Sequence, residues 1–407
     1  MLLIFTTRTE NPMQIRDIPL DEALWTYKEP EVFEVISKER AIELATTVAL
    51  KGAEFVHKNP RVGAVFVDKE HRFLAAAAHL VYGQGHAEIN LLLKIQERGL
   101  ESSLDGATLY VTLEPCSHVG KTQSCAQALL KTSIKKVIYA MKDPNPFVLG
   151  RGISLLEEHG IVCEHSEVFQ EKTEHLLDSF KWSLKHKTPF VALKAALTMN
   201  GVAAYKGDRK NWITSERARA YGHWLRMNYE AILVGAGTVF YDNPVLNVRH
   251  PYLKGRTPQR IVLDPHGRGL LARDISQQQL VAIEPEKTVW FCRREFWDSH
   301  HDLQEKLKER GVKCLSLERG WTLKTLLEDL GNMGIASLLV EGGVYVWDSF
   351  LKERFVNKIY LFQAPKIISG DTLHFASSVD DTRRLEYTHV TALAEDLLIE
   401  TRFVEEF

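Results

Sequence analysis

Hydrophobic and polar residues recur with two periods along the first part of the chain, and these periods predict a succession of helices and strands. From Lys38 to Phe55, apolar residues lie at helical spacing behind Ser37, a residue type that caps helices. Short strands are predicted to follow at Val62–Val67, Phe73–Ala78, Leu109–Leu113, Lys136–Met141 and Val162–His165. Helical patterns separate them at His86–Arg98, Cys125–Lys131 and Ile153–Gly160. The alternation predicts a sandwich of helices and strands.

The alternation begins again after a charged helical stretch between Glu167 and Lys187, within which we place a domain boundary. Beyond it, apolar runs typical of buried strands lie at Phe190–Leu197, Ala231–Val234, Arg260–Asp264, Thr288–Cys292, Lys313–Leu317, Ser337–Val340 and Lys358–Phe362. Val390–Leu393 and Leu397–Phe403 predict a closing antiparallel pair. We therefore predict an extension at 1–36 and two α/β domains at 37–180 and 181–407, the second with a mostly parallel sheet.

Composition and charge limit the partners that this chain can have. Its 407 residues are 45% hydrophobic and 26% charged with a formal net charge of −2, which is typical of a globular protein and offers no basic surface to nucleic acid. The apolar run Met1–Phe5 is shorter than a signal-peptide core, and no run approaches the ~20 apolar residues of a membrane span. We expect no nucleic-acid or membrane partner. The sequence leaves open whether the chain starts at Met1 or Met13.

The cysteines are few for a chain of this length and odd in number: Cys116, Cys125, Cys163, Cys292 and Cys314. Secreted proteins that depend on disulfides carry a denser and usually even set. We therefore expect a cytoplasmic protein without a disulfide framework.

Two short segments carry the residue types of a zinc-dependent deaminase. His86 and Glu88 form a His-x-Glu pair, and Cys116 follows a proline and precedes Cys125. One imidazole and two thiolates can hold a catalytic Zn²⁺ that leaves its fourth position to water, while the glutamate moves the proton of that water. We predict His86, Cys116 and Cys125 as the ligands of one zinc per chain and Glu88 as general acid and base. A structural site is the alternative, with His118 as fourth ligand.

Eight residues separate Cys116 from Cys125, where the usual deaminase signature has two. The run from Pro115 to Cys125 matches Pro-Cys-Ser-His-x-Gly-x-Thr-x-x-Cys, and it resembles the bifunctional riboflavin-biosynthesis deaminase/reductase family. Residues 57–63 and 143–152 resemble two further motifs of this family, His-x-Asn-Pro-x-Val-Gly and Asp-Pro-Asn-Pro-x-Val-x-Gly-x-Gly. The resemblance extends over residues 37 to about 405.

The resemblance implies a cytidine-deaminase-like α/β/α sandwich followed by a dihydrofolate-reductase-like α/β domain that binds NADPH, in a homo-oligomer. It implies that Asn59 binds the pyrimidine edge, since an amide both donates and accepts hydrogen bonds; an Asn-Pro turn is the other interpretation. It favours His118 as a residue of the substrate loop. Lys121 and Thr122 would bind a phosphate or lie in a solvated loop. We expect the remaining histidines nearby, His57 and His79, to support the fold.

The second domain repeats the family's order of motifs between Trp212 and Arg249 and again at Glu341. By these matches, the ribose phosphate substrate would be bound by Lys210, Arg226, Leu246, Arg249 and Glu341. NADPH would be bound by Ala196, Trp212, Thr238, Asp242 and Gly343. Gly235 and Gly237 at a strand end let a backbone approach a cofactor, and Gly342-Gly343 opens a helix whose N-terminus can hold a pyrophosphate. No Gly-x-Gly-x-x-Gly fingerprint is present, so a Rossmann domain is not predicted.

Three residues depart from the family pattern: Asn200 replaces an aspartate, Lys210 a serine and Pro265 a small residue. The predicted function is hydrolytic deamination of 2,5-diamino-6-ribosylamino-4(3H)-pyrimidinone 5′-phosphate, followed by NADPH reduction of its ribosyl group. Asn200, which cannot act as a base, and Lys210 motivate an alternative, a deaminase whose second domain is a scaffold. A sensor or structural homologue without catalysis is a third hypothesis.

Overall fold

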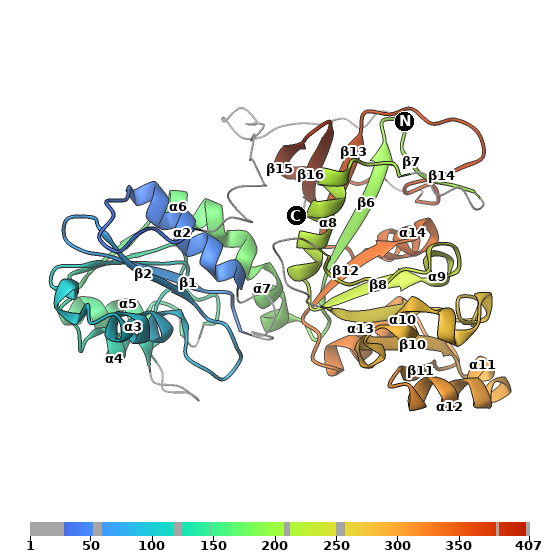
Figure 1. The fold of residues 1–407 in the computed structure, drawn as a ribbon, viewed down its shortest axis with the longest axis horizontal. Coiled ribbons are helices and arrows are strands. Elements are labelled where there is room, and N and C mark those ends of the chain that lie inside the picture. Colours follow the sequence, from blue (N-terminus) through green and yellow to red (C-terminus); the bar gives the residue numbers. More distant parts are fainter. Residues whose placement is uncertain are drawn as a thin grey trace. The chain divides into compact units, whose positions relative to one another are not determined.

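The computed structural model describes residues 28–51, 59–117, 124–146, 148–206, 212–249, 257–379 and 382–403. Two compact units meet in sequence at Lys187 and Thr188 (Figure 1). This change of unit comes just after α7 (Asp178–Lys185), whereas the boundary predicted from the sequence, at 180/181, lies inside that helix. No helix in the described ranges combines the length and the apolar character needed to cross a membrane.

The described part of the first unit contains a five-stranded sheet in the order β2-β1-β3-β4-β5. Its strands are β1 (Gly63–Val67), β2 (Phe73–Ala78), β3 (Thr108–Val111), β4 (Lys136–Tyr139) and β5 (Val162–His165). β1 runs antiparallel to β2 and β3, while β3, β4 and β5 are parallel. Every residue of β1 and β2 is buried, which explains why both strands are continuous apolar runs in the sequence.

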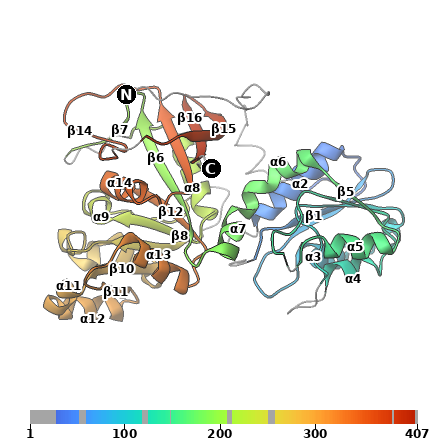
Figure 2. The ribbon, with the colours of Figure 1, turned by 180° about the vertical axis from the view of Figure 1, so that it is seen from behind.

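Helices cover both faces of this sheet, as the sequence predicted. α2 (Lys38–Lys51) and α6 (Glu167–Thr173) lie on one face, and α3 (Ala87–Glu97), α4 (Cys125–Leu129) and α5 (Arg151–Glu158) lie on the other (Figures 1 and 2). The charged stretch that was predicted to be helical is divided into α6, a 3₁₀ turn at Glu174–Leu177 and α7. The metal motif therefore lies on the α3, α4 and α5 side of the sheet.

The described end of the predicted extension pairs with the edge of this sheet. Phe33 donates its backbone N–H to the carbonyl of Phe73 at 2.8 Å, and Phe73 donates to the carbonyl of Glu34 at 2.7 Å. Val35 forms a single antiparallel bridge with Arg72. Because β2 is an edge strand, these bonds occupy backbone groups that another chain could otherwise pair with.

The second unit is built on a larger sheet in the order β11-β10-β9-β8-β12-β6-β13-β16-β15. Its strands are β6 (Phe190–Thr198), β8 (Ala231–Gly235), β9 (Gln259–Leu263), β10 (Thr288–Arg293), β11 (Lys313–Leu317), β12 (Ser337–Gly342), β13 (Lys358–Ala364), β15 (Leu385–Leu393) and β16 (Asp396–Phe403). Strands β11 to β13 in this order are parallel, and β16 and β15 close the sheet in antiparallel fashion, as predicted. The short pair β7 (Val202–Tyr205) and β14 (Thr372–His374) was not predicted.

Different helices pack on the two faces of the large sheet. α13 (Leu323–Asn332) and α14 (Val344–Lys352) join the apolar core on one face, to which β6 contributes Leu193 and Leu197. Because strand residues alternate between faces, Lys194 points to the other side. There α8 (Glu216–Met227) packs through Tyr221, whose ring lies 6.0 Å from that of Phe362. The remaining described α-helices are α9 (Ala236–Asp242), α10 (Gln279–Ala282), α11 (Arg294–Ser299) and α12 (His301–Glu309).

Candidate active sites

The three predicted metal ligands come together in the first unit. His86 Nδ1 lies 3.6 Å from Cys116 Sγ and 3.4 Å from Cys125 Sγ, and all three donor atoms lie within 4.8 Å of one another. Tetrahedral zinc with the usual bond lengths separates a nitrogen and a sulfur ligand by about 3.6 Å. The donor set and its spacing therefore fit Zn²⁺ with one position left open among the described residues.

Two helix N-termini place these ligands. His86 is the extended N-cap of α3, and Cys125 is the first residue of α4. Ser124 caps α4 by accepting a hydrogen bond from Gln127 N, and it donates to the carbonyl of Cys116 at 3.0 Å. The Cys125 N–H points at Cys116 Sγ at 3.5 Å. Because free N–H groups and the positive end of the helix dipole favour a thiolate, this arrangement prepares both sulfurs for a metal.

Glu88 lies in the first turn of α3 and is only 3% exposed. Burial raises the pKa of this carboxyl to about 7, and the neighbouring Cys116 sulfur adds to the shift. Hydrogen bonding with Cys125 lowers the pKa of Cys116 to about 4, whereas the pKa of Cys125 is raised. A carboxyl that titrates near neutral pH beside the ligand cluster is suited to accept and return a proton.

Asn59 is tied to the ligand cluster through His79. The Asn59 amide nitrogen lies 3.1 Å from His79 Nε2, and His79 Nδ1 lies 3.0 Å from the carbonyl of Gly85. Because that carbonyl can only accept, the proton of a neutral His79 is on Nδ1, and Nε2 accepts from the Asn59 amide. The rings of His79 and His86 are 5.2 Å apart. His79 therefore orients Asn59 and leaves its amide oxygen for other donors.

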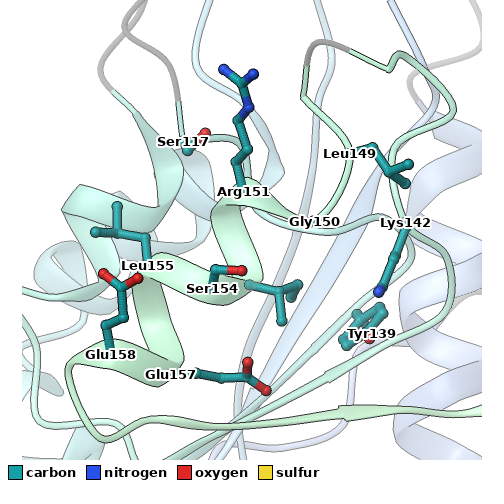
Figure 3. A pocket seen from close by; sticks show the side chains of 11 residues that line it. Ser117, Tyr139, Lys142, Leu149, Gly150, Arg151, Ser154, Leu155, Glu157 and Glu158 are labelled. Carbon is teal, nitrogen blue, oxygen red and sulfur yellow. The ribbon is translucent and has the colours of Figure 1, made fainter.

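Several candidates of the first domain lie outside the described residues: His57, His118, Lys121 and Thr122. Beside Ser117, a cavity of about 570 Å³ opens against the start of α5. Figure 3 shows Arg151 on the same side as Ser117, with Glu157 and Glu158 at the opposite end. A Cβ on Gly152 would lie 1.6 Å from the carbonyl oxygen of Pro115, so only glycine lets α5 pack this closely against the ligand segment.

The second unit brings Arg226 of α8 and Glu341 of β12 into a buried two-point ion pair. Arg226 donates from Nε and Nη2 to the Glu341 carboxylate at 2.6 and 2.8 Å, and their side chains are 15% and 9% exposed. Lys194 lies in the same charged group, where burial lowers its pKa and Glu341 opposes that shift. Arg226 and burial act in opposite directions on Glu341, and the pKa of Glu341 is lowered. The site therefore contains a buried, ionised carboxylate.

The segment after α9 carries two further substrate candidates, Leu246 and Arg249. Leu246 is buried with φ of +55°, and Arg249 is exposed. Arg226 Nη1 donates to the carbonyl of Asn247 at 2.9 Å, which joins this segment to the ion pair. The side-chain oxygen of Asn247 is buried and accepts no hydrogen bond from the described residues. A ligand with a donor group would satisfy it.

Thr238 and Gly343, two of the cofactor candidates, lie together at the carboxyl ends of adjacent parallel strands β8 and β12. A Cβ on Gly343 would be 3.7 Å from Thr238 Oγ1, and around Gly237 a Cβ would meet no described atom within 4 Å. Trp347 Nε1, one turn into α14, is buried without a hydrogen-bond acceptor among the described residues. Open space, helix N-termini and an unsatisfied donor fit a phosphate-bearing cofactor.

The Trp212 loop is held by three charged side chains. Lys366 donates to the carbonyl of Ile213 at 2.7 Å, and Asp396 accepts from the backbone N–H of Ser215 at 2.6 Å. Arg219 lies 4.8 Å from the centre of the Trp212 ring, and this indole is 75% exposed. The other cofactor candidates are Ala196, half-buried in β6, and Asp242, exposed at the end of α9; Lys210 lies outside the described residues.

Asn200, the first departure from the family pattern, has a structural partner. Its side-chain amide donates to the carbonyl of Ile368 at 2.7 Å and accepts from the N–H of the same residue at 3.2 Å. Thr198 also donates to it at 2.7 Å. A carboxylate could not make the first of these bonds, because it has no donor. Pro265, another departure, accepts from Arg293 N at 3.0 Å at the end of β9.

Four residues of these sites were not predicted as site residues. Lys194, Lys366 and Asp396 were not singled out in the sequence, and His79 was expected only to support the fold. A signal existed for Lys194, because a lysine inside the apolar run of β6 is unusual unless it has a partner. The others belong to no local pattern. Their partners lie up to 181 positions away in sequence, as between Asp396 and Ser215.

Comparison with known proteins identifies both units. Residues 36–141 match the cytidine and deoxycytidylate deaminase zinc-binding region, and residues 189–399 match the RibD C-terminal domain. The fold and the sites thus define a two-domain protein with a zinc-dependent deaminase domain followed by a reductase domain, which confirms the predicted fold class. The chain belongs to the family of the riboflavin biosynthesis protein RibD.

Individual relatives are similar to this chain over nearly their whole length. The riboflavin biosynthesis protein RibD of Aquifex aeolicus is 36% identical over 88% of this chain and 96% of its own, and that of Bacillus amyloliquefaciens is 34% identical over 88% and 95%. A crystal structure of a diaminohydroxyphosphoribosylaminopyrimidine deaminase/5-amino-6-(5-phosphoribosylamino)uracil reductase from Thermotoga maritima is 32% identical, with a TM-score of 0.74 over 90% of this chain and 98% of that one. The resemblance inferred from the motifs is confirmed.

Proposed function

We propose that this chain catalyses two consecutive steps of riboflavin biosynthesis. The first is hydrolytic deamination of 2,5-diamino-6-ribosylamino-4(3H)-pyrimidinone 5′-phosphate. The second is reduction by NADPH of the resulting 5-amino-6-(5-phosphoribosylamino)uracil to the ribityl product. Membership of the RibD family and the name of the Thermotoga maritima relative support both steps. The spacing of the His86, Cys116 and Cys125 donor atoms is the observation that carries the proposal.

In the first step, His86, Cys116 and Cys125 would hold the zinc ion. Zinc in such a site supplies Lewis acidity that makes water nucleophilic near neutral pH. Glu88 takes one proton from that water and passes it to the ring nitrogen, and it then carries the second proton, from the hydroxyl added to the ring carbon, to the departing ammonia. Its buried position supports this role, because a pKa of about 7 lets the carboxyl both accept and release a proton.

Asn59 binds the edge of the pyrimidine. The bond from its amide nitrogen to His79 leaves the amide oxygen as an acceptor for an amino group of the ring. His79 has to be neutral for this bond, and burial supports that state by lowering its pKa. The second amide hydrogen of Asn59 can donate to a ring carbonyl. A substrate with both groups on one edge fits this pair of functions.

In the second step, Thr238 and Gly343 would hold the phosphates of NADPH, and Trp212, Ala196 and Asp242 would contact the rest of the cofactor. NADPH supplies the hydride. The unsatisfied Trp347 donor and the open space above Gly237 support a bound cofactor in this region.

Arg249 and Arg226 recognise the phosphate of the ribose phosphate substrate, with Leu246 and Lys210 completing its site. Arg249 is exposed, and its guanidinium is available for two-point contact with a phosphate. Arg226 has five N–H groups, of which three are used by Glu341 and Asn247, so two remain for a ligand. The ionised Glu341 carboxylate accepts hydrogen bonds from the ribose hydroxyls.

The alternative, a deaminase with a scaffold in place of the reductase, was motivated by Asn200 and Lys210. Asn200 pairs with the Ile368 backbone, and this pairing explains why an amide rather than a carboxylate is present at this position. Lys210 lies outside the described residues. Asn200 therefore no longer supports the scaffold alternative. The non-enzymatic hypothesis is opposed by the presence of the complete set of His86, Glu88, Cys116 and Cys125.

Separate assays of the two half-reactions test the proposal. Zinc-loaded protein should release ammonia from the diaminopyrimidinone, and it should oxidise NADPH only when the deaminated product is present. Absence of NADPH oxidation with that product, in protein that still deaminates, would establish the scaffold alternative.

The role of Glu88 is tested with Glu88→Ala, measured by ammonia release and by metal analysis. We expect a loss of at least about 100-fold in deamination with about one zinc per chain retained, because the carboxylate is not a ligand. Glu97→Ala, at the exposed end of the same helix, should leave both values unchanged. Loss of zinc from Glu88→Ala would show that its role is wrongly assigned.

We also propose that the protein acts in the cytoplasm as a homo-oligomer. All five cysteines are described and free, which supports a reducing compartment. The family resemblance alone supports self-association. Cell fractionation and analytical ultracentrifugation test the two statements.

A further inference from the structure

His223 lies one turn before Arg226 on α8, so the two side chains are neighbours on one face of the helix. Both reach the segment after α9. His223 Nδ1 is 3.1 Å from the backbone N of Arg249 and 3.2 Å from the carbonyl oxygen of Asn247. Arg226 Nη1 is 2.9 Å from the same carbonyl oxygen. Two side chains of one helix thus hold this backbone on both sides of Val248.

The hydrogen-bond partners select the tautomer of His223. The Arg249 N–H can only donate, so Nδ1 has to accept, and the ring proton is then on Nε2. The carbonyl of Asn247 is already satisfied by Arg226 and needs no bond from the imidazole. One assignment therefore satisfies all of these groups: Arg226 donates to Asn247, and Arg249 donates to a neutral His223.

The charged groups around His223 favour this neutral form. Burial, Arg226 and Arg249 lower its pKa to about 4, while the Asn247 carbonyl and Glu341 act in the opposite direction with smaller effect. A protonated Nδ1 would place an N–H against the N–H of Arg249 and break the bond. The acceptor is thus present throughout the neutral pH range.

The segment that His223 holds has an unusual backbone. Asn243 and Leu246 have φ of +43° and +55°, in the left-handed region that non-glycine residues seldom adopt. Such a conformation persists where surrounding contacts fix it. Arg260 donates to the carbonyl of Val245 at 3.0 Å, and the Asn243 side chain bonds to residues 277 and 279. These anchors hold the start of the segment, and His223 holds its end at Arg249.

We propose that His223 is a positioning residue for phosphate recognition in the reductase site. Its neutral imidazole fixes the backbone at Arg249 and thereby sets the point from which the Arg249 guanidinium reaches the phosphate of the ribosylaminouracil substrate. The inference rests on the proposed function, in which Arg249 binds that phosphate. His223 itself makes no contact with the reacting atoms.

The test measures the KM and kcat of the reductase, and the dissociation constant of 5-amino-6-(5-phosphoribosylamino)uracil, for variants of the full chain. His223→Leu removes the acceptor and should raise the KM and the dissociation constant of this substrate about five- to tenfold, the effect of one lost hydrogen bond. The kcat and the KM for NADPH should change less than about twofold. His223→Asn places an amide oxygen near the position of Nδ1 and should restore the KM to within about twofold of the native value. Deaminase activity reports on the fold of each sample.

Arg249→Ala separates this inference from the proposed function. It should weaken substrate binding at least as much as His223→Leu, and the double variant should be no worse than Arg249→Ala alone, because both changes remove one interaction. Native-like substrate binding by His223→Leu, or an equal rise in the KM for NADPH, overturns the inference and leaves the proposed function in place. Native-like binding by Arg249→Ala overturns both.

Discussion

The zinc site and the reductase site are assembled in different ways. The proposed zinc ligands come from two short motifs. His86 and Cys125 lie at the starts of helices, and Cys116 is bonded to the N-cap of the second helix, so local backbone structure carries most of the geometry. The reductase site instead depends on side-chain bonds across the fold. Arg226 and Glu341 are 115 positions apart, and Lys366 and Ile213 are 153 apart.

The difference has consequences for stability and specificity. In the first unit, the proposed ligands are not part of the cluster of buried apolar residues around the sheet, so we expect that replacing one removes the metal and leaves that core intact. In the second unit, Arg226, Glu341 and Lys194 are themselves largely buried, so removing one partner is expected to affect folding as well as binding. Substitutions in the local zinc motif should therefore change the chemistry alone, whereas substitutions in the dispersed reductase site should change both stability and binding.

The largest effect is expected from a substitution that abolishes one activity and leaves the other unchanged. Cys125→Ala removes one of three ligands, so we expect loss of zinc and a fall of at least about 10³-fold in deamination, because the site then lacks its metal chemistry. Reduction of the deaminated product should stay within about twofold of the native rate. Metal analysis and the two separate assays measure this. A parallel loss of reductase activity would mean that the two sites are not independent.

Glu341→Ala is the corresponding test in the second unit. It leaves the buried Arg226 without its carboxylate, and breaking a mostly buried pair costs about 3–5 kcal/mol. We expect a large drop in the thermal transition of the reductase unit and loss of NADPH oxidation, with zinc content unchanged.

Glu318→Ala is the matched control, because the Arg294–Glu318 pair of the same unit is also two-pronged but exposed. Exposed pairs contribute little to stability. The unfolding transition of this control should therefore stay at the native temperature. Equal effects of the two substitutions would contradict the claim that burial matters at Glu341.

A smaller effect is expected where this chain departs from its family. Asn200→Asp replaces the amide that donates to Ile368 with a carboxylate, which should cost about 1–2 kcal/mol at neutral pH. Only the protonated form of the introduced carboxyl could donate, so its folded-state pKa would lie above the unfolded value of about 3.9. Stability lost at neutral pH should therefore return as the pH falls toward that value. Denaturant unfolding of native and variant protein between pH 4 and pH 8 measures this, and a pH-independent difference would contradict the assigned bond.

The smallest expected effect concerns the N-cap of α4. Ser124→Ala removes both the cap and the bond to the Cys116 carbonyl, and we expect a loss of about 1 kcal/mol in stability and several-fold weaker zinc binding. Ser166→Ala removes a comparable cap from α6 in the same unit. It should cost similar stability and leave zinc affinity unchanged. Competition with a chelator measures the affinity, and equal zinc binding in both variants would show that the cap has no role in the metal site.

Much of the fold could be predicted because the local patterns agree with the tertiary structure. Each segment predicted as a strand overlaps a strand of the structure, and the central parallel strands among them are apolar because both of their faces are buried. The short pair β7 and β14 was missed because its strands are only half-buried and carry no strong pattern. The pairing of Val35 with Arg72 was missed because a bridge to an edge strand has no sequence signature.

Residue type and spacing over short distances were enough to predict the zinc ligand set, the neighbouring glutamate and the order of two α/β domains. Three contacts could be found only in the folded chain: Asn200 pairs with Ile368, Arg226 pairs with Glu341, and His223 accepts from Arg249. A side chain's hydrogen-bond partner depends on which strands and helices become neighbours. That information belongs to the packed fold, where burial requires each polar group to find a partner.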